Sequence, residues 1–276
     1  FLDAEQPGGV TRNLALAAKA SGEVSSGARY GLFVSLPRGM QELTDALAVH
    51  VAPHVRLGAR VMSLTPDAGG YTVTWEQQGR SESTRASHVV LALASSHVTR
   101  LVSPFAPALG RELGALSLGS AAAVTLAFRQ GDLPRPLTSY GFVVPAIERR
   151  MVMACTFSSA KWDGRAPEDA ALLRVFLGGH SHPTIHQQPD DRLLGFAREA
   201  LRELVGIHAS PGLVRVDRYV SAMPRYHVGH LERVARVEAL VRALPGLHLV
   251  GGAYRGVGMP DVIASAEQAA QAMNRS

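Results

Sequence analysis

Apolar residues recur every three or four positions in several segments of the chain, a spacing that places them on one face of a helix. Residues 40–51 follow this spacing and predict a helix. The clearest case is 190–205, whose apolar residues form a single stripe and whose first two residues are acidic, as the helix dipole favours. Two further helices are predicted over 229–244 and 261–273.

Other segments have the patterns of strands. Residues 71–75 alternate bulky and hydroxyl side chains after a Pro-Asp-Ala-Gly-Gly turn, which predicts a half-buried strand of a hairpin. Residues 88–94 are almost continuously apolar, which predicts a strand buried on both faces, followed by a helix that Ser95 or Ser96 caps. Further strands are predicted at 121–128, 151–157, 172–177, 213–220 and 247–250.

Composition indicates a folded globular protein, because 46% of the 276 residues are hydrophobic and only 18% are charged. The net charge of +5 comes from arginines scattered along the chain, so no nucleic-acid partner is expected. No apolar run is long enough to span a membrane. The single cysteine, Cys155, lies in an apolar run and is expected in the core. The first residues contain no initiator Met and no signal peptide, and they are typical of the middle of a longer chain.

The most informative segment joins the last predicted strand to the last predicted helix. It contains four glycines, followed by Pro260 at the predicted helix start; the glycines are Gly251, Gly252, Gly256 and Gly258. Glycines let the backbone approach a flat or anionic ligand, and a helix N-terminus points free N–H groups at it. The dinucleotide fingerprint is not matched, since Asp261 stands where the third glycine would be. An ordinary strand–turn–helix is the alternative interpretation.

Several motifs resemble one family. These are residues 36–43 (LPRGMQEL), 161–167 (KWDGRAP), 172–179 (LLRVFLGG), 222–230 (AMPRYHVGH) and the glycine segment with its Pro-Asp-Val-Ile helix start. Together they resemble the protoporphyrinogen oxidase and coproporphyrinogen III oxidase family, FAD-dependent enzymes of the amine-oxidase-like superfamily. Arg225 replaces the family's Gln and Val262 its Cys. The resemblance runs from about residue 33 to the end of the chain.

The resemblance implies an α/β plus α+β fold, in which a partial, p-hydroxybenzoate-hydroxylase-like FAD-binding domain is interleaved with a mixed-sheet substrate domain. The implied parts are a remnant of a helical, membrane-side region (1–34), the middle piece of the FAD domain (35–96), the substrate-binding domain (97–217) and the C-terminal FAD piece (218–276). The family's N-terminal Gly-x-Gly-x-x-Gly unit, which binds the pyrophosphate, is missing from this sequence. A truncated chain should therefore have an exposed sheet edge and an uncovered apolar face.

The implied cofactor is FAD. By resemblance, the Val61 backbone meets the adenine, and Gly256, Val257, Gly258 and Met259 lie beside the isoalloxazine ring. Tyr219 falls where related amine oxidases place an aromatic side chain against the flavin. Gly251 and Gly252 complete the predicted cofactor-binding set. No side chain is identified as catalytic.

The implied reaction is oxidation of protoporphyrinogen IX or coproporphyrinogen III to the porphyrin in haem biosynthesis, with oxygen as acceptor. The implied location is the cytoplasm, with peripheral contact to a membrane. The alternatives are a flavin amine oxidase or carotenoid desaturase, against which the 161–167 motif argues, and an inactive truncated fragment that cannot hold FAD.

Several residues invite other interpretations that the pattern does not favour. His180, His182 and His186 flank Pro183 in a predicted loop without a cysteine, which favours a solvated connection over a metal site. No Gly-x-Ser-x-Gly elbow supports a hydrolase. His227 and His230 are expected to cap or pack, and Arg174 and Lys161 to form surface pairs rather than bind a propionate.

Overall fold

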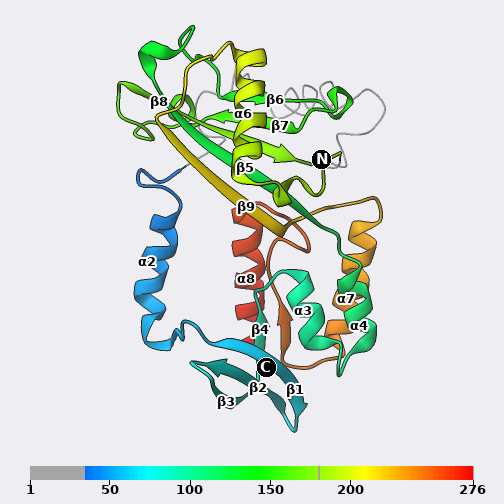
Figure 1. Ribbon diagram of the computed structural model, residues 1–276. Helices are drawn as coiled ribbons and strands as arrows, with labels where there is room; N and C mark the ends of the chain where they lie inside the picture. The colour runs from blue at the N-terminus through cyan, green and yellow to red at the C-terminus, as the bar shows by residue number, and fades with distance from the viewer. Residues whose placement is uncertain (1–34, 180, 276) are drawn as a thin grey trace, which may run out of the picture. The chain divides into compact units, whose positions relative to one another are not determined.

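The structure is a computed structural model that describes residues 35–179 and 181–275 (Figure 1). The predicted remnant at 1–34 and His180 lie outside the described residues. Contacts between residues divide the chain into two compact units, 1–52 and 53–276. In the first unit, helix α2 (Gln41–Val51) confirms the predicted helix. No side chain of α2 is buried in the described part of the chain.

The second unit begins with a three-stranded antiparallel meander. Its strands are β1 (Arg60–Asp67), β2 (Gly70–Gln77) and β3 (Arg80–Ala86). The predicted hairpin turn joins β1 to β2, where Gly69 has a φ of +80° that favours glycine. Leu64, Tyr71 and Trp75 are the buried residues of the meander. The sequence pattern missed β3 because its residues are almost all polar and exposed.

A parallel strand pair brings together segments that are far apart in the sequence. Strand β4 (Val89–Leu91) pairs with β10 (Leu247–Leu249), and Val89 lies opposite Leu247. Four helices belong to this part of the chain: α3 (Ser95–Val102), α4 (Pro107–Gly114), α7 (His230–Arg242) and α8 (Met259–Met273). Leu91, Val98 and Val234 belong to one buried cluster there, so residues from β4, α3 and α7 share a core.

Two predictions about this region are wrong. Val90 in β4 is 40% exposed, so the strand is not buried on both faces; a third strand or a helix on that side would be needed to cover it. The N-cap of α3 is Ala94 and no side chain caps the helix. The Ser95 hydroxyl is instead buried without a hydrogen-bond partner.

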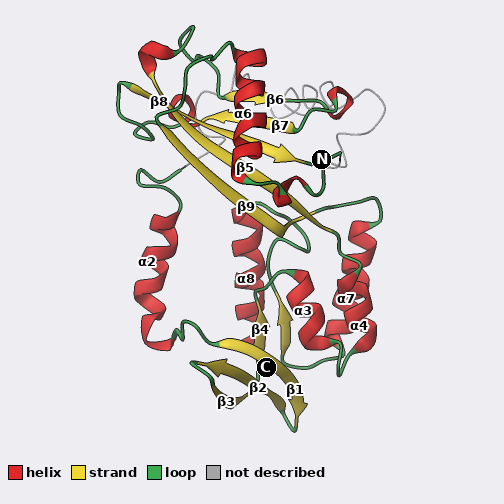
Figure 2. Ribbon diagram, viewed as in Figure 1, coloured by secondary structure: helices red, strands yellow, loops and turns green. Residues whose placement is uncertain are grey.

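The largest element is a five-stranded sheet in the order β6-β7-β8-β5-β9 (Figure 2). Its strands are β5 (Leu118–Arg129), β6 (Gly141–Val143), β7 (Val152–Phe157), β8 (Ala170–Gly178) and β9 (Leu213–Pro224). A mixed sheet was expected, but every pairing between these strands is antiparallel. The pairs β6–β7 and β7–β8 join consecutive strands, whereas β5 pairs with β8 and β9, which follow later in the chain.

Helix α6 (Asp190–Val205) covers one face of the five-stranded sheet and confirms the predicted helix. Leu193, Ala197 and Leu201 are fully buried in the same cluster as Leu173 and Val175 of β8. The helix ends at Gly206, whose φ of +82° gives a left-handed C-cap. Short helices occupy the connections: η2 (Ala52–His54), η3 (Gln130–Asp132), η4 (Ala146–Glu148), α5 (Ser158–Lys161) and η5 (Ile185–Gln187).

Cys155 is buried in β7, as predicted, and burial raises the pKa of its thiol to about 12. Because the thiolate is the reactive form, Cys155 should react with a disulfide reagent at about pH 8 at least about a hundredfold more slowly in the folded than in the denatured protein. Absorbance of the released thiol chromophore measures both rates. Equal rates in the two states would contradict this burial.

His88 and His248 lie side by side where β4 and β10 pair. His88 Nδ1 and His248 Nε2 are 3.2 Å apart and the rings are stacked. Burial, and then the neighbouring His88, lower the pKa of His248 below its ordinary 6.5. Because the pKa of His248 is lower in the folded than in the unfolded protein, the folded state favours the neutral ring. The contribution of neutral His248 to the free energy of unfolding is complete above about pH 6.5 and is lost as the pH falls through the folded pKa.

His248→Gln should therefore reduce the loss of unfolding free energy between about pH 8 and about pH 5. Urea-induced unfolding at several pH values measures this loss. His208→Gln, which changes an exposed histidine, provides the control. Parallel pH profiles for the wild type and His248→Gln would contradict the role of the pair.

Candidate functional site

The glycine segment forms a partly exposed loop between β10 and α8, in which Arg255 and Val257 are exposed and Ala253 and Tyr254 are buried. Helix α8 begins at Met259, two residues before the predicted start, with Gly258 as its N-cap and Pro260 in its first turn. Proline is well suited there because its missing N–H is not needed in the first turn. Asp261 is the acidic residue of that turn. We call residues 250–258 the glycine loop.

The glycines of this loop are required for two different reasons. Gly251 has a φ of +120°, which favours glycine, and a Cβ there would meet no atom within 4 Å. At Gly256 a Cβ would collide with Asp261 Oδ2, and at Gly258 it would lie 2.9 Å from the same oxygen. The Asp261 side chain therefore fills the space that side chains at 256 and 258 would need. The sequence pattern predicted these two glycines to serve the approach of a ligand, and it did not indicate the contact with Asp261.

Side chains from outside the loop fix its backbone. The Tyr226 hydroxyl donates a hydrogen bond to the Gly252 carbonyl at 2.7 Å. The Gly251 N–H donates to Ser265 Oγ at 3.2 Å, and this hydroxyl donates to the Val262 carbonyl. Arg255 makes two bonds of 2.6 Å to the Glu238 carboxylate, which lower the pKa of Glu238. Such bidentate pairs fix geometry as well as charge.

The segment before α7 packs against the same loop. The rings of Tyr226 and His230 stack at 3.9 Å, and His230 Nε2 donates to the Tyr254 carbonyl at 2.7 Å. Burial, and then the Asp261 carboxylate, raise the pKa of Tyr226. His230 is buried, which confirms that it packs, whereas His227 is exposed. Arg225, which stands where the family has Gln, lies over Gly119 of β5. A Cβ at position 119 would be 2.5 Å from the Nε of Arg225.

The surface around the start of α8 is open and apolar. Val257 is 61% and Met259 46% exposed, and Ala269 is the one buried residue among those described in α8. A cavity of about 670 Å³ adjoins the loop, between β10, α7 and α8. Tyr254 lines this cavity, and its hydroxyl is buried without a partner. The glycine loop therefore leaves room for a ligand.

The eight predicted cofactor residues lie on four parts of the chain: the glycine loop, α8, β1 and β9. Six of them are in the glycine loop or at the start of α8. Val61 is in β1, where its carbonyl accepts a bond from Arg100 at 3.3 Å. Tyr219 is in β9 opposite Ala121 and is 37% exposed. Sequence reasoning missed Asp261, Tyr226 and Ser265 as partners of the loop, although the spacing from Gly256 and Gly258 to Asp261 is a visible signal.

The face of the five-stranded sheet opposite α6 is a second half-exposed surface. Thr156, Arg174 and Phe176 alternate there with buried residues that face α6. Arg174 pairs with Asp217 at 3.5 Å and donates to the Thr125 hydroxyl at 3.3 Å. These contacts confirm the expected surface pairing of Arg174. Lys161 Nζ lies 5.3 Å from the centre of the Trp162 ring.

The described residues show no other cofactor chemistry. They contain no cluster of three or more His, Cys, Asp or Glu side chains that could hold a metal ion. His182 Nε2 bonds the Arg149 carbonyl, and the His186 ring nitrogen Nδ1 is buried without a partner. Within the described ranges, no helix has both the length and the apolar character needed to cross a membrane.

The parallel strand pair with its glycine loop, joined to an antiparallel sheet, recurs in known proteins, and similarity to them places the chain in the class of flavin-dependent oxidoreductases. A crystal structure from Exiguobacterium sp. 255-15, assigned to the protoporphyrinogen oxidases, has this fold. It matches 99% of this chain with a TM-score of 0.78 and 28% sequence identity. The match covers 56% of the length of that protein. The sequence profile of the flavin containing amine oxidoreductases matches residues 9–274. The chain belongs to this family.

Curated relatives refine the comparison. Coproporphyrinogen III oxidase from Bacillus subtilis is 28% identical over 89% of this chain, which covers 52% of that enzyme. Coproporphyrinogen III oxidase from Propionibacterium freudenreichii is 37% identical over 67% of the chain, which covers 35% of it. The chain thus spans about half or less of these relatives. The resemblance to porphyrinogen oxidases is confirmed.

Proposed function

We propose that the chain forms the isoalloxazine-facing part of a FAD-dependent porphyrinogen oxidase. The observation that carries this proposal is the partly exposed glycine loop at the start of α8, where Val257 and Met259 expose apolar side chains next to a helix N-terminus. The names of the curated relatives support protoporphyrinogen IX or coproporphyrinogen III as the substrate class.

The residues present fit a flavin. The glycine loop would admit the edge of a flat ring, and Val257 and Met259 would pack against it with their exposed apolar side chains. The N-terminal turn of α8 would favour negative charge on the ring, although Asp261 offsets part of that potential. Val61 would meet the adenine, and Tyr219 would contact the ring from β9.

A bound flavin would supply the two-electron acceptor that no side chain provides. Conversion of the porphyrinogen removes six electrons and six protons in three steps, and with oxygen as acceptor each step yields one hydrogen peroxide. The half-exposed face that carries Thr156 and Phe176 would position the macrocycle. Oxidation of a porphyrinogen by a bound flavin would need no acid–base pair from this chain, and we assign none.

Titration of the purified chain with FAD, FMN and riboflavin tests the cofactor. We expect a colourless preparation that quenches the fluorescence of all three flavins with similar, weak affinity, because the proposed contacts are to the ring. Gly195→Ala provides a control variant that should fold and bind flavin like the wild type. Gly195 lies in α6, and a Cβ there meets nothing within 4 Å. Absence of saturable quenching by any flavin would overturn the proposal.

Activity is tested separately with saturating FAD. Coproporphyrinogen III, protoporphyrinogen IX and putrescine are supplied in parallel, and porphyrin fluorescence and hydrogen peroxide are measured. Porphyrin formation above the rate without protein supports the substrate class. Peroxide release from putrescine alone would favour an amine oxidase, and flavin binding without turnover would leave a cofactor-binding but inactive chain, contrary to the proposed activity.

A further inference from the structure

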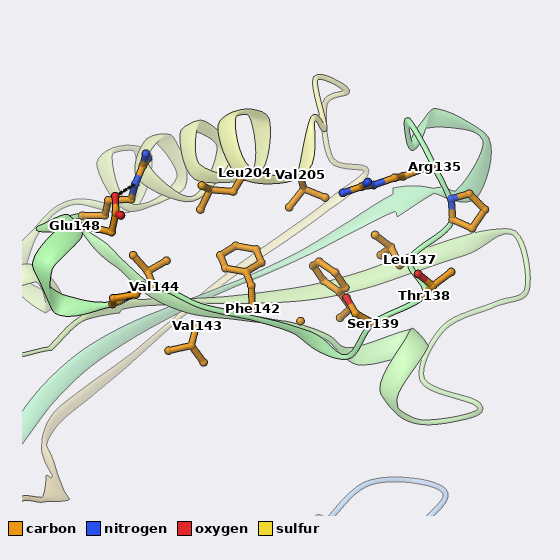
Figure 3. A pocket seen from close by; sticks show the side chains of 15 residues that line it. Arg135, Leu137, Thr138, Ser139, Phe142, Val143, Val144, Glu148, Leu204 and Val205 are labelled. Atoms are coloured by element: carbon orange, nitrogen blue, oxygen red, sulfur yellow. Dashed lines mark ion pairs between the residues drawn. The ribbon is translucent and has the colours of Figure 1, made fainter. Parts of the chain in front are cut away.

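A second cavity lies at the β6 edge of the five-stranded sheet, opposite the edge that β9 forms. It has a volume of about 530 Å³ and lies between the edge strand β6 and the C-terminal end of α6 (Figure 3). Residues 135–139, which lead into β6, form one side of it. Because β6 and β9 are at opposite edges of the sheet, this groove is separate from the strand that carries Tyr219.

The floor of the groove is apolar and aromatic. The Phe142 and Phe157 rings meet edge to face at 6.1 Å and 71°. Figure 3 shows Phe142 pointing toward Leu204 of α6, with Val144 on the same side and Val143 on the other. Leu204 is 40% exposed, so part of its side chain is open to a ligand. This floor offers stacking and edge contacts to an aromatic ligand.

The charged residues at the groove differ in how they are paired, and Arg135 is the arginine that forms no ion pair within the described residues. Arg150 pairs with Glu203 at 2.5 Å and with Glu148 at 3.8 Å, so the formal charges at this end sum to −1. Arg135 lines the other side and has no acidic partner within ion-pair distance in the described part of the chain. In Figure 3 its guanidinium is directed across the groove toward Val205.

We propose that this groove binds a small aromatic carboxylate, with its ring against Phe142 and Leu204 and its carboxylate on Arg135. The volume lies in the range of small-molecule sites, about 300–1,000 Å³. A guanidinium fork matches a carboxylate in charge and geometry. A bound peptide strand is disfavoured, because β6 offers an edge of only three residues. The site requires no flavin, so it can be tested whatever the outcome at the glycine loop.

Calorimetric titration with indole-3-acetate and with its neutral analogue indole-3-acetamide tests the assignment. The carboxylate should bind more tightly than the amide, and salt at about 0.5 M should weaken only the carboxylate. Arg135→Gln should weaken the carboxylate about fivefold to tenfold and leave the amide unchanged. The matched control is Arg198→Gln, an exposed arginine of α6 that does not line the groove.

A second variant separates charge from folding. Leu204→Asp places a negative charge at the half-exposed floor position 204, where it should exclude the carboxylate without removing a buried side chain. Circular dichroism confirms that each variant is folded. Equal affinity for acid and amide, no binding of either, or equal losses in Arg135→Gln and Arg198→Gln would overturn the proposal.

Discussion

Replacing Gly256 with alanine should disturb the glycine loop and weaken flavin binding at least about tenfold. The alanine Cβ would collide with Asp261 Oδ2 and lie 2.5 Å from Asp261 Cβ, so the first turn of α8 has to move. Overpacking of this kind costs about 1–3 kcal/mol. The backbone of Gly256 is not left-handed, so the contact alone is responsible. Flavin fluorescence titration and thermal unfolding measure the two effects.

Second-site changes at Asp261 identify the contact. Asp261→Ala keeps the Cβ that lies 2.5 Å away, whereas Asp261→Gly removes it. The Gly256→Ala/Asp261→Gly protein should therefore recover more flavin affinity than Gly256→Ala/Asp261→Ala, each compared with its single Asp261 variant. Wild-type affinity in Gly256→Ala would show that the packing of Asp261 does not fix the loop.

Leu201→Ala should lower the free energy of unfolding by about 2–5 kcal/mol, the range for a buried leucine whose removal leaves a cavity. Leu201 is fully buried in the core beneath α6. Leu204→Ala on the same helix makes the same change in helix propensity, but Leu204 is 40% exposed and its loss should be under about 1 kcal/mol. Urea denaturation followed by circular dichroism compares them. Equal losses would contradict the assigned face of α6.

Elements with a strong apolar period could be predicted from the sequence. Helix α6 has the predicted bounds, because its stripe, its acidic start and Gly206 all indicate the same element. Strand β3 could not be predicted, since it is held by pairing with β2 and its side chains face solvent. The exposure of Val90 was also missed: a continuous apolar run shows what a strand can bury, and packing decides what it does bury.

The candidate site divides in the same way. The glycine loop was visible as a strand, four glycines and a helix start, because those features are local. The side chains that hold it were not, since Tyr226 and Glu238 reach the loop only through the tertiary fold. The aromatic groove at β6 was also invisible, because it is assembled from β6, β7 and the end of α6.

The free edge of β9 has a consequence for handling the protein. This strand has 12 residues, is the last of its sheet within the described ranges, and exposes Leu213, Val220 and Met223. Backbone groups along such an edge can template strand addition from another molecule. Light scattering should therefore show self-association that grows with concentration and time, and dilute storage should preserve the monodisperse chain.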